Sequence, residues 1–189
     1  DIVELGEGRL AIAVGDVAGK GMPAALLMAP LQGSLRTLLS AGLRGEELMA
    51  KLNAHLCSNI PSNRLITLFY GELDTATGEL DYVNAGHNPP LLVREDGTVE
   101  KLSDGGLVLG MFENIVYDGG RVEMRRGDTL VIYSDGVTET WDPDGEEYGE
   151  ESLLALVVRD RRLAAEELQN SILRAIEGFE AGARATDDR

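Results

Sequence analysis

Two apolar runs that each carry an aspartate at or near their end constrain this chain more than any other feature. The first covers residues 10–16 and ends in Asp16, and the second covers residues 128–136 and carries Asp135 near its end. Runs of this kind, rich in β-branched residues and bounded by Gly and Asp, are typical of buried strands. Each is predicted to deliver one carboxylate to a strand end. Two such carboxylates from distant segments indicate a shared site for a hard cation.

The length of 189 residues predicts a single domain, residues 1–189, that can bury a sizeable core. Cys57 is the one cysteine, so no internal disulfide can form. No apolar run of about 18 residues and no charged leader with an apolar core is present, which predicts a cytoplasmic protein. A net charge of −16 repels phosphate backbones and anionic lipids, so we expect neither nucleic acid nor direct membrane contact.

Hydrophobic periodicity predicts a mixture of helices and strands. A helix is expected from Pro23, with Leu31 and Leu35 on its buried face, and a second helix ends near Cys57. Period two then predicts a hairpin of residues 65–74 and 79–84. Further strands are expected at residues 91–94, 99–102 and 121–125, and further helices at 150–158 and 163–179. This mixture predicts a sheet-based α/β (α+β) sandwich.

The glycine-rich turn after Asp16 is not a phosphate loop, because that pattern needs glycine at Val14 and Ser or Thr at Gly21. Its glycines would let the backbone approach a metal and expose the Val17 carbonyl, although this segment taken alone favours a structural turn. Asp135 has the alternative role of a helix cap.

Five segments in order closely resemble the motifs of one family: GDVAGKGMPAA (15–25), NAGHNPP (84–90), GLVLG (106–110), YSDGVTE (133–139) and DD (187–188). The family is that of the bacterial SpoIIE/RsbU-type phosphatases, which are metal-dependent serine/threonine phosphatases of the PP2C (PPM) class. The resemblance covers nearly the whole chain. It implies a PP2C-like αββα sandwich of two mainly antiparallel sheets flanked by helices, with two Mn²⁺ or Mg²⁺ ions.

The resemblance also implies roles for particular residues. Asp16 and Asp135 would be catalytic, with Asp16 bridging both metals, the Val17 carbonyl adding to one, and Asp135 and Asp187 holding the other. A metal-activated water would attack the phosphate directly. The candidates for outer-shell or substrate contacts are Asp1, Gly136, Asp188, Lys20 and His87.

The chain departs from the family pattern in three places. The family's early Gly-Gly-Asp strand and its final strand lie outside the 189 residues, so the domain is expected to lack these two segments. Ala18 stands where eukaryotic relatives carry a histidine that protonates the leaving oxygen. His87 is either a substitute for that acid or a residue that fixes a turn by hydrogen bonding.

The predicted function is hydrolysis of phosphoserine or phosphothreonine on a regulatory protein. The resemblance implies that this substrate is a STAS-type anti-sigma factor antagonist, within sigma factor regulation, and that a sensory domain precedes the chain. Homodimerisation stays open. The alternative is a catalytically silent phosphatase-like module that binds a partner without hydrolysing it.

Overall fold

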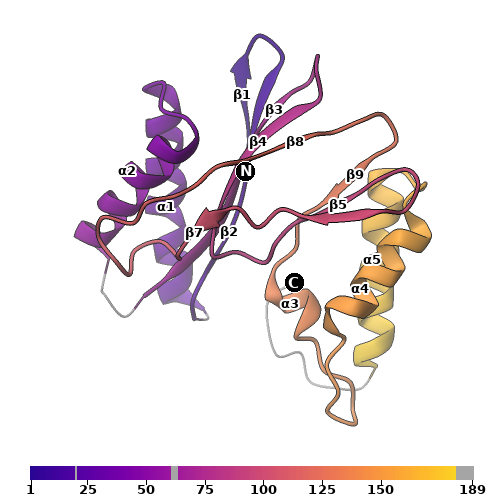
Figure 1. The fold of residues 1–189 in the computed structure, drawn as a ribbon. Helices are drawn as coiled ribbons and strands as arrows, with labels where there is room; N and C mark the ends of the chain where they lie inside the picture. The colour runs from indigo at the N-terminus through magenta and orange to yellow at the C-terminus, as the bar shows by residue number, and fades with distance from the viewer. Residues whose placement is uncertain (20, 61–63, 182–189) are drawn as a thin grey trace. The chain divides into compact units, whose positions relative to one another are not determined.

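The computed structural model describes residues 1–19, 21–60 and 64–181 (Figure 1). The chain divides into two compact units, each described here by itself. The first unit comprises Asp1–Pro89 and Leu102–Met124, and the second comprises Pro90–Lys101 and Arg125–Arg189. The single-domain prediction therefore stays a prediction.

The first unit is built on a mainly antiparallel sheet. Among its described residues, six strands pair in the order β1-β2-β3-β4-β7, with β8 also paired to β4. The β2–β3 ladder runs without a break from the Arg9–Asp74 pair to the Val17–Ile66 pair. Strand β3 pairs antiparallel with β4 from Leu68–Ala85 to Leu73–Leu80, so the predicted hairpin is confirmed. The elements are β1 (Ile2–Gly6), β2 (Arg9–Val17), α1 (Met22–Ser40), α2 (Gly45–Asn59), β3 (Ile66–Asp74), β4 (Glu79–Ala85), β7 (Gly105–Gly106) and β8 (Gly120–Glu123).

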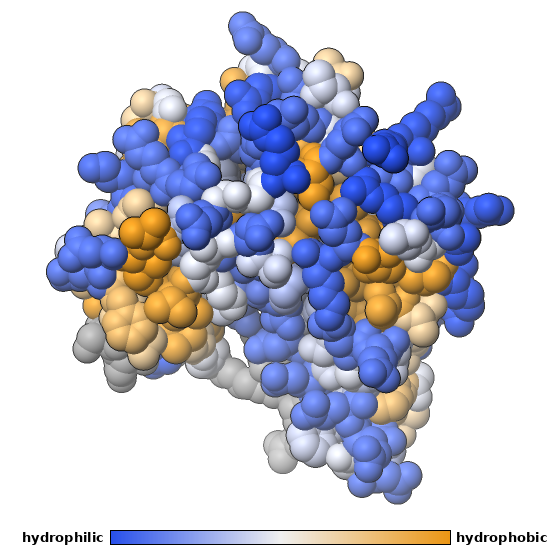
Figure 2. All heavy atoms as spheres, in the orientation of Figure 1, coloured by the Kyte–Doolittle hydropathy of each residue, from blue (hydrophilic) through white to orange (hydrophobic). Residues whose placement is uncertain are grey.

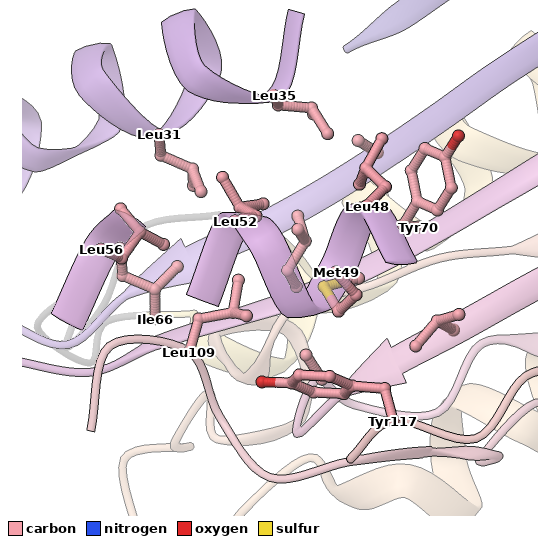
Figure 3. Close-up of a cluster of buried hydrophobic side chains, with 14 of the residues drawn as sticks. Leu31, Leu35, Leu48, Met49, Leu52, Leu56, Ile66, Tyr70, Leu109 and Tyr117 are labelled. Carbon is pink, nitrogen blue, oxygen red and sulfur yellow. The ribbon is translucent and has the colours of Figure 1, made fainter. Parts of the chain in front are cut away.

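Helices α1 and α2 cover one face of this sheet and form the core of the first unit (Figures 1 and 3). Leu31 and Leu35 of α1 are buried as predicted, and Leu52 of α2 is completely buried. Burying each such leucine stabilises the fold by about 1.5–3 kcal/mol. The other labelled members of the cluster in Figure 3 are Leu48, Met49, Leu56, Ile66, Tyr70, Leu109 and Tyr117.

A buried carboxylate fastens α2 to the sheet. Glu72 of β3 is 3% exposed and accepts hydrogen bonds from the Gly45 amide (3.0 Å), the Tyr70 hydroxyl (2.8 Å) and the Arg9 guanidinium (3.1 Å). The Arg44 Nε lies 3.6 Å from the same carboxylate. Burial raises the pKa of Tyr70 far above its usual range, and the charge of Glu72 raises it further. These contacts fix the start of α2, because Gly45 is its first residue.

The segment between β7 and β8 carries exposed apolar side chains on a fixed backbone. Figure 2 shows hydrophobic residues gathered over this segment, where Leu107, Met111 and Phe112 are about half exposed. Asn53 of α2 donates to the Phe112 carbonyl (2.8 Å) and accepts from the Gly110 amide (2.9 Å). Asn53 therefore holds the segment against α2 through one donated and one accepted hydrogen bond.

The second unit combines a small antiparallel sheet with helices. Its described strands pair in the order β6-β5-β9. Leu91 and Val93 of β5 share a buried cluster with Leu153 and Val157 of α4. The predicted helices and the pair of short strands are confirmed. The elements are β5 (Leu91–Val93), β6 (Val99–Lys101), β9 (Thr129–Val131), α3 (Asp135–Thr138), α4 (Gly149–Asp160) and α5 (Ala165–Glu180).

The strand predicted over residues 128–136 is shorter than expected. Its ladder ends at Val131, which pairs with Leu91, the first residue of β5. Pro89 and Pro90 precede Leu91 and have no amide hydrogen, so the partner strand cannot extend the ladder. Asp135 therefore begins the short helix α3 instead of standing at the strand end. None of the helices in the described residues is both long and apolar enough to cross a bilayer.

Candidate metal centre

Strand β2 places Asp16 on the face of the sheet opposite α1 and α2. Side chains alternate between the two faces of a strand, and Ala13 and Val17 are buried in the helix-facing core. The cross-strand partner of Asp16 is Thr67 of β3. A Cβ at Gly15 would lie 2.9 Å from the Thr67 carbonyl oxygen, so only glycine fits beside this aspartate.

The turn after β2 directs the Val17 carbonyl away from β3. The Ala18 amide donates to the Leu65 carbonyl (3.0 Å), and alternate residues of an antiparallel strand face the same neighbour. The backbone groups of Val17 therefore point to the opposite edge of β2. Gly19 has a φ of 111°, and a Cβ there would lie 2.5 Å from Nη1 of Arg64. The backbone itself requires glycine in this turn.

Asp135 lies at the first turn of α3. Ser134 is the N-cap residue, so Asp135 is not the cap of a helix that begins at Val137. The Glu139 amide donates to the Asp135 carbonyl (2.7 Å) and closes the turn, and Gly136 is buried within it. A carboxylate in the first turn of a helix interacts favourably with the helix dipole.

Tyr133 connects this region to α4. Its ring is buried, and its hydroxyl donates to Glu150 at 3.2 Å. Burial raises the pKa of Tyr133 to about 12, and the charge of Glu150 contributes to the rise. The residue two positions before Asp135 is therefore fixed in the core of the second unit.

The described donors fit a hard divalent cation by their chemistry. Asp16 and Asp135 offer carboxylates and Val17 offers a carbonyl, which are the oxygen ligands that Mg²⁺ and related ions prefer. Lys20, Asp187 and Asp188 lie outside the described residues. Within the part of the chain that is described, no three His, Cys, Asp or Glu side chains form a cluster that could hold a metal. The ligand set therefore stays a prediction.

The carboxylate of Asp1 contacts helix α1. It accepts two hydrogen bonds from Arg36, at 2.7 and 2.6 Å, and one from Gln32 at 3.2 Å. Asp1 also pairs with Ala13 through the Ala13 amide (2.9 Å), so its side chain lies on the helix-facing side, opposite Asp16. Arg36 and Gln32 are absent from the predicted site. Their spacing of four on one helix face is a signal that could have indicated a shared partner.

His87 lies in a tight turn after β4 and is only 4% exposed. Its amide donates to the Asn84 side chain (2.7 Å), and its ring Nδ1 lies 2.8 Å from the hydroxyl of Thr67. Gly86 has a φ of 68°, and a Cβ there would lie 2.5 Å from the Val108 side chain. The backbone of His87 thus takes part in the turn, while its ring reaches the neighbouring strand.

Comparison with known proteins places these features in one family. The sequence model of the family "Stage II sporulation protein E (SpoIIE)" matches residues 6–189. The phosphoserine phosphatase RsbU of Bacillus subtilis is 34% identical over 129 residues, which cover 68% of this chain and 38% of RsbU.

Solved structures agree on the fold. One is the crystal structure of the RsbU and RsbW domains of a Mycobacterium tuberculosis protein, with a TM-score of 0.76 and 29% sequence identity. The match covers 91% of this chain and 49% of the mycobacterial chain. The SiaA-PP2C domain of Pseudomonas aeruginosa has a TM-score of 0.88 and 17% identity, with coverage of 100% and 76%. The chain thus spans less than half the length of RsbU and of the mycobacterial chain, and the predicted PP2C-like α+β class is confirmed.

Proposed function

Because the chain belongs to the SpoIIE family, we propose that it is a metal-dependent protein serine/threonine phosphatase. Its reaction is hydrolysis of phosphoserine or phosphothreonine on a regulatory protein. The observation that carries the proposal is the placement of Asp16 in the family's first motif. Strand β2 and the required glycine beside it hold Asp16 one residue before the end of the strand. A carboxylate held near the end of a rigid strand is preorganised to bind a cation.

The proposed ligands are Asp16, the Val17 carbonyl, Asp135 and Asp187, which would hold two Mn²⁺ or Mg²⁺ ions. When bound, such ions supply an activated water and neutralise the charge of the phosphate. Asp16 and Asp135 supply negative charge that keeps the ions in place. Ala18 offers no imidazole for protonation of the leaving oxygen, so that proton comes from solvent or from the substrate.

The proposed substrate is a phosphorylated STAS-type antagonist of an anti-sigma factor. The name of the relative RsbU, a phosphoserine phosphatase, supports a phosphoserine protein as substrate. The mycobacterial structure, in which an RsbU domain accompanies an RsbW domain, supports a partner within the same kind of regulatory system. The greater length of these relatives supports a further, sensory domain in the full-length protein.

The test is Mn²⁺-dependent phosphate release from a phosphoserine STAS protein by the full-length enzyme. We expect Asp135→Asn to lower turnover by about 10²-fold or more, since loss of one charged transition-state contact costs about 3 kcal/mol or more. Asp144→Asn, in an exposed acidic turn, is the matched control and should keep wild-type turnover. Tight binding of the phosphoprotein without metal-dependent turnover would support the catalytically silent module instead.

A further inference from the structure

Thr67 connects two of the candidate site residues within the first unit. It lies directly opposite Asp16 in the β2–β3 ladder, and its hydroxyl is 2.8 Å from Nδ1 of His87. Strands β2, β3 and β4 are successive neighbours in the sheet, and His87 follows the end of β4 (Figure 1). Asp16, Thr67 and His87 therefore come from three adjacent segments at one end of the sheet.

The register places the side chains of Thr67 and Asp16 on the same face of the sheet, opposite each other. Directly opposed residues of an antiparallel pair project from the same face, with Cβ atoms about 4.5–5.5 Å apart. A threonine side chain has few χ1 rotamers, and its hydroxyl offers one hydrogen and two acceptor lone pairs. If His87 donates from Nδ1 to the Thr67 oxygen, the hydrogen of that hydroxyl is left to donate elsewhere.

The turn that carries His87 is rigid enough to orient its ring. The Asn84 side chain accepts a hydrogen bond from the His87 amide and donates one to the Leu102 carbonyl at 3.2 Å. Gly86 fits where any Cβ would collide with Val108. A side chain held this way can impose one rotamer on the group that it contacts.

We propose that His87 and Thr67 are positioning residues for Asp16. His87 donates its Nδ1 hydrogen to the Thr67 oxygen, and Thr67 donates its hydroxyl hydrogen to the Asp16 carboxylate. The proposal rests on the proposed function, in which that carboxylate binds a divalent cation. Hydrogen bonds of this kind orient metal ligands, and their loss typically costs about 10–100-fold in affinity. With its ring held against Thr67, His87 supports the orientation of the proposed ligand.

The first experiment measures Mn²⁺ affinity of the full-length protein by isothermal titration calorimetry without substrate. Thr67→Val keeps the shape of the side chain but removes the hydroxyl, and we expect its Kd for Mn²⁺ to rise about 10–100-fold. Thr67→Ser keeps the hydroxyl and should restore most of the affinity. Thr129→Val, which replaces a threonine on β9, is the matched control and should leave Kd unchanged. A folded Thr67→Val protein with wild-type Kd would overturn the proposal.

The second experiment needs no metal. Ring ¹⁵N NMR reports which nitrogen of His87 carries the hydrogen, and we expect Nδ1 to be protonated in the wild-type protein at pH 7.5. A neutral ring protonated only at Nε2 would overturn the proposed direction of donation. Failure of the proposed function has a different signature, since wild-type protein would then bind Mn²⁺ without releasing phosphate while the effects of Thr67→Val on Kd persisted.

Discussion

Asp16 and Asp135 are supported in different ways by the two units. Asp16 stands near the end of a nine-residue strand that is paired residue by residue with β3. Asp135 follows a strand of three residues and begins a helix of four. The first carboxylate is thus oriented by a long ladder of backbone hydrogen bonds, and the second by the local geometry of one helical turn.

The difference teaches that two proposed metal ligands can be held with unequal rigidity. Sheet ladders hold a side chain more precisely than short loops and single turns do. The first unit also anchors its helix α2 to the sheet through the buried carboxylate of Glu72. Helix α4 instead joins the core of the second unit by apolar packing and by a hydrogen bond from Tyr133 to the partly exposed Glu150. We therefore expect mutations in the two units to differ in how much stability they remove and in which strands they affect.

The largest expected effect comes from truncating a buried leucine in each unit. Leu52→Ala in α2 and Leu153→Ala in α4 should each lower the free energy of unfolding by about 2–5 kcal/mol, because both side chains are completely buried. Hydrogen exchange should show the loss of protection in β2 and β3 for the first variant, and in β5 and β9 for the second. If both variants lost hydrogen-exchange protection equally in both units, the two units would unfold together as a single cooperative domain.

A smaller effect is expected at the buried carboxylate. Glu72→Gln should lower the free energy of unfolding by about 1–3 kcal/mol, since it removes the charge that Arg9 and Arg44 face. Both arginines are partly exposed, which keeps the cost below that of a fully buried pair. Urea denaturation gives the value. The control is Glu79→Gln, which affects an exposed pair with Arg121 and should change stability by less than about 1 kcal/mol. Equal losses in the two variants would mean that burial of Glu72 contributes nothing.

The smallest effect is expected where α4 meets α5. Hydrogen bonds from Arg159, and then from Ser171, lower the pKa of Asp160 from 3.8 to about 2. A lowered pKa stabilises the fold above pH 4, and this stabilisation is lost as the pH falls toward 2. Ser171→Ala should therefore cost about 0.5–1.5 kcal/mol at pH 6 and almost nothing near pH 2. Thermal unfolding against pH measures this, and a pH-independent loss would contradict the assigned cause.

The secondary structure of this chain follows largely from local pattern. Period two predicts β3 and β4, and leucines spaced by three and four predict α1 and α2, because each pattern reports one buried face. The two-residue strand β7 consists of Gly105 and Gly106 and has no such pattern. The early end of β9 depends on prolines in a partner strand, which periodicity within residues 128–136 does not reveal.

Less of the candidate site could be predicted, because its contacts join distant segments. Motifs indicate Asp16 and Asp135, yet Thr67 carries no motif and gains its importance from pairing with β2. The register between β2 and β3 would have been needed to find it. The contact between Asp1 and Arg36 likewise depends on how α1 lies on the sheet, which no spacing within either segment specifies.

The alternation along β2 has a consequence for how this family can vary. Ala11 and Ala13 face the helices while Asp16 faces the other side of the sheet. Asp16 must therefore stay an odd number of positions along the strand from each alanine. Deleting or inserting one residue before Gly15 would rotate the carboxylate into the apolar layer beneath α1. Natural variation in this strand is therefore expected to proceed by substitution, with changes of length confined to the turns at its ends.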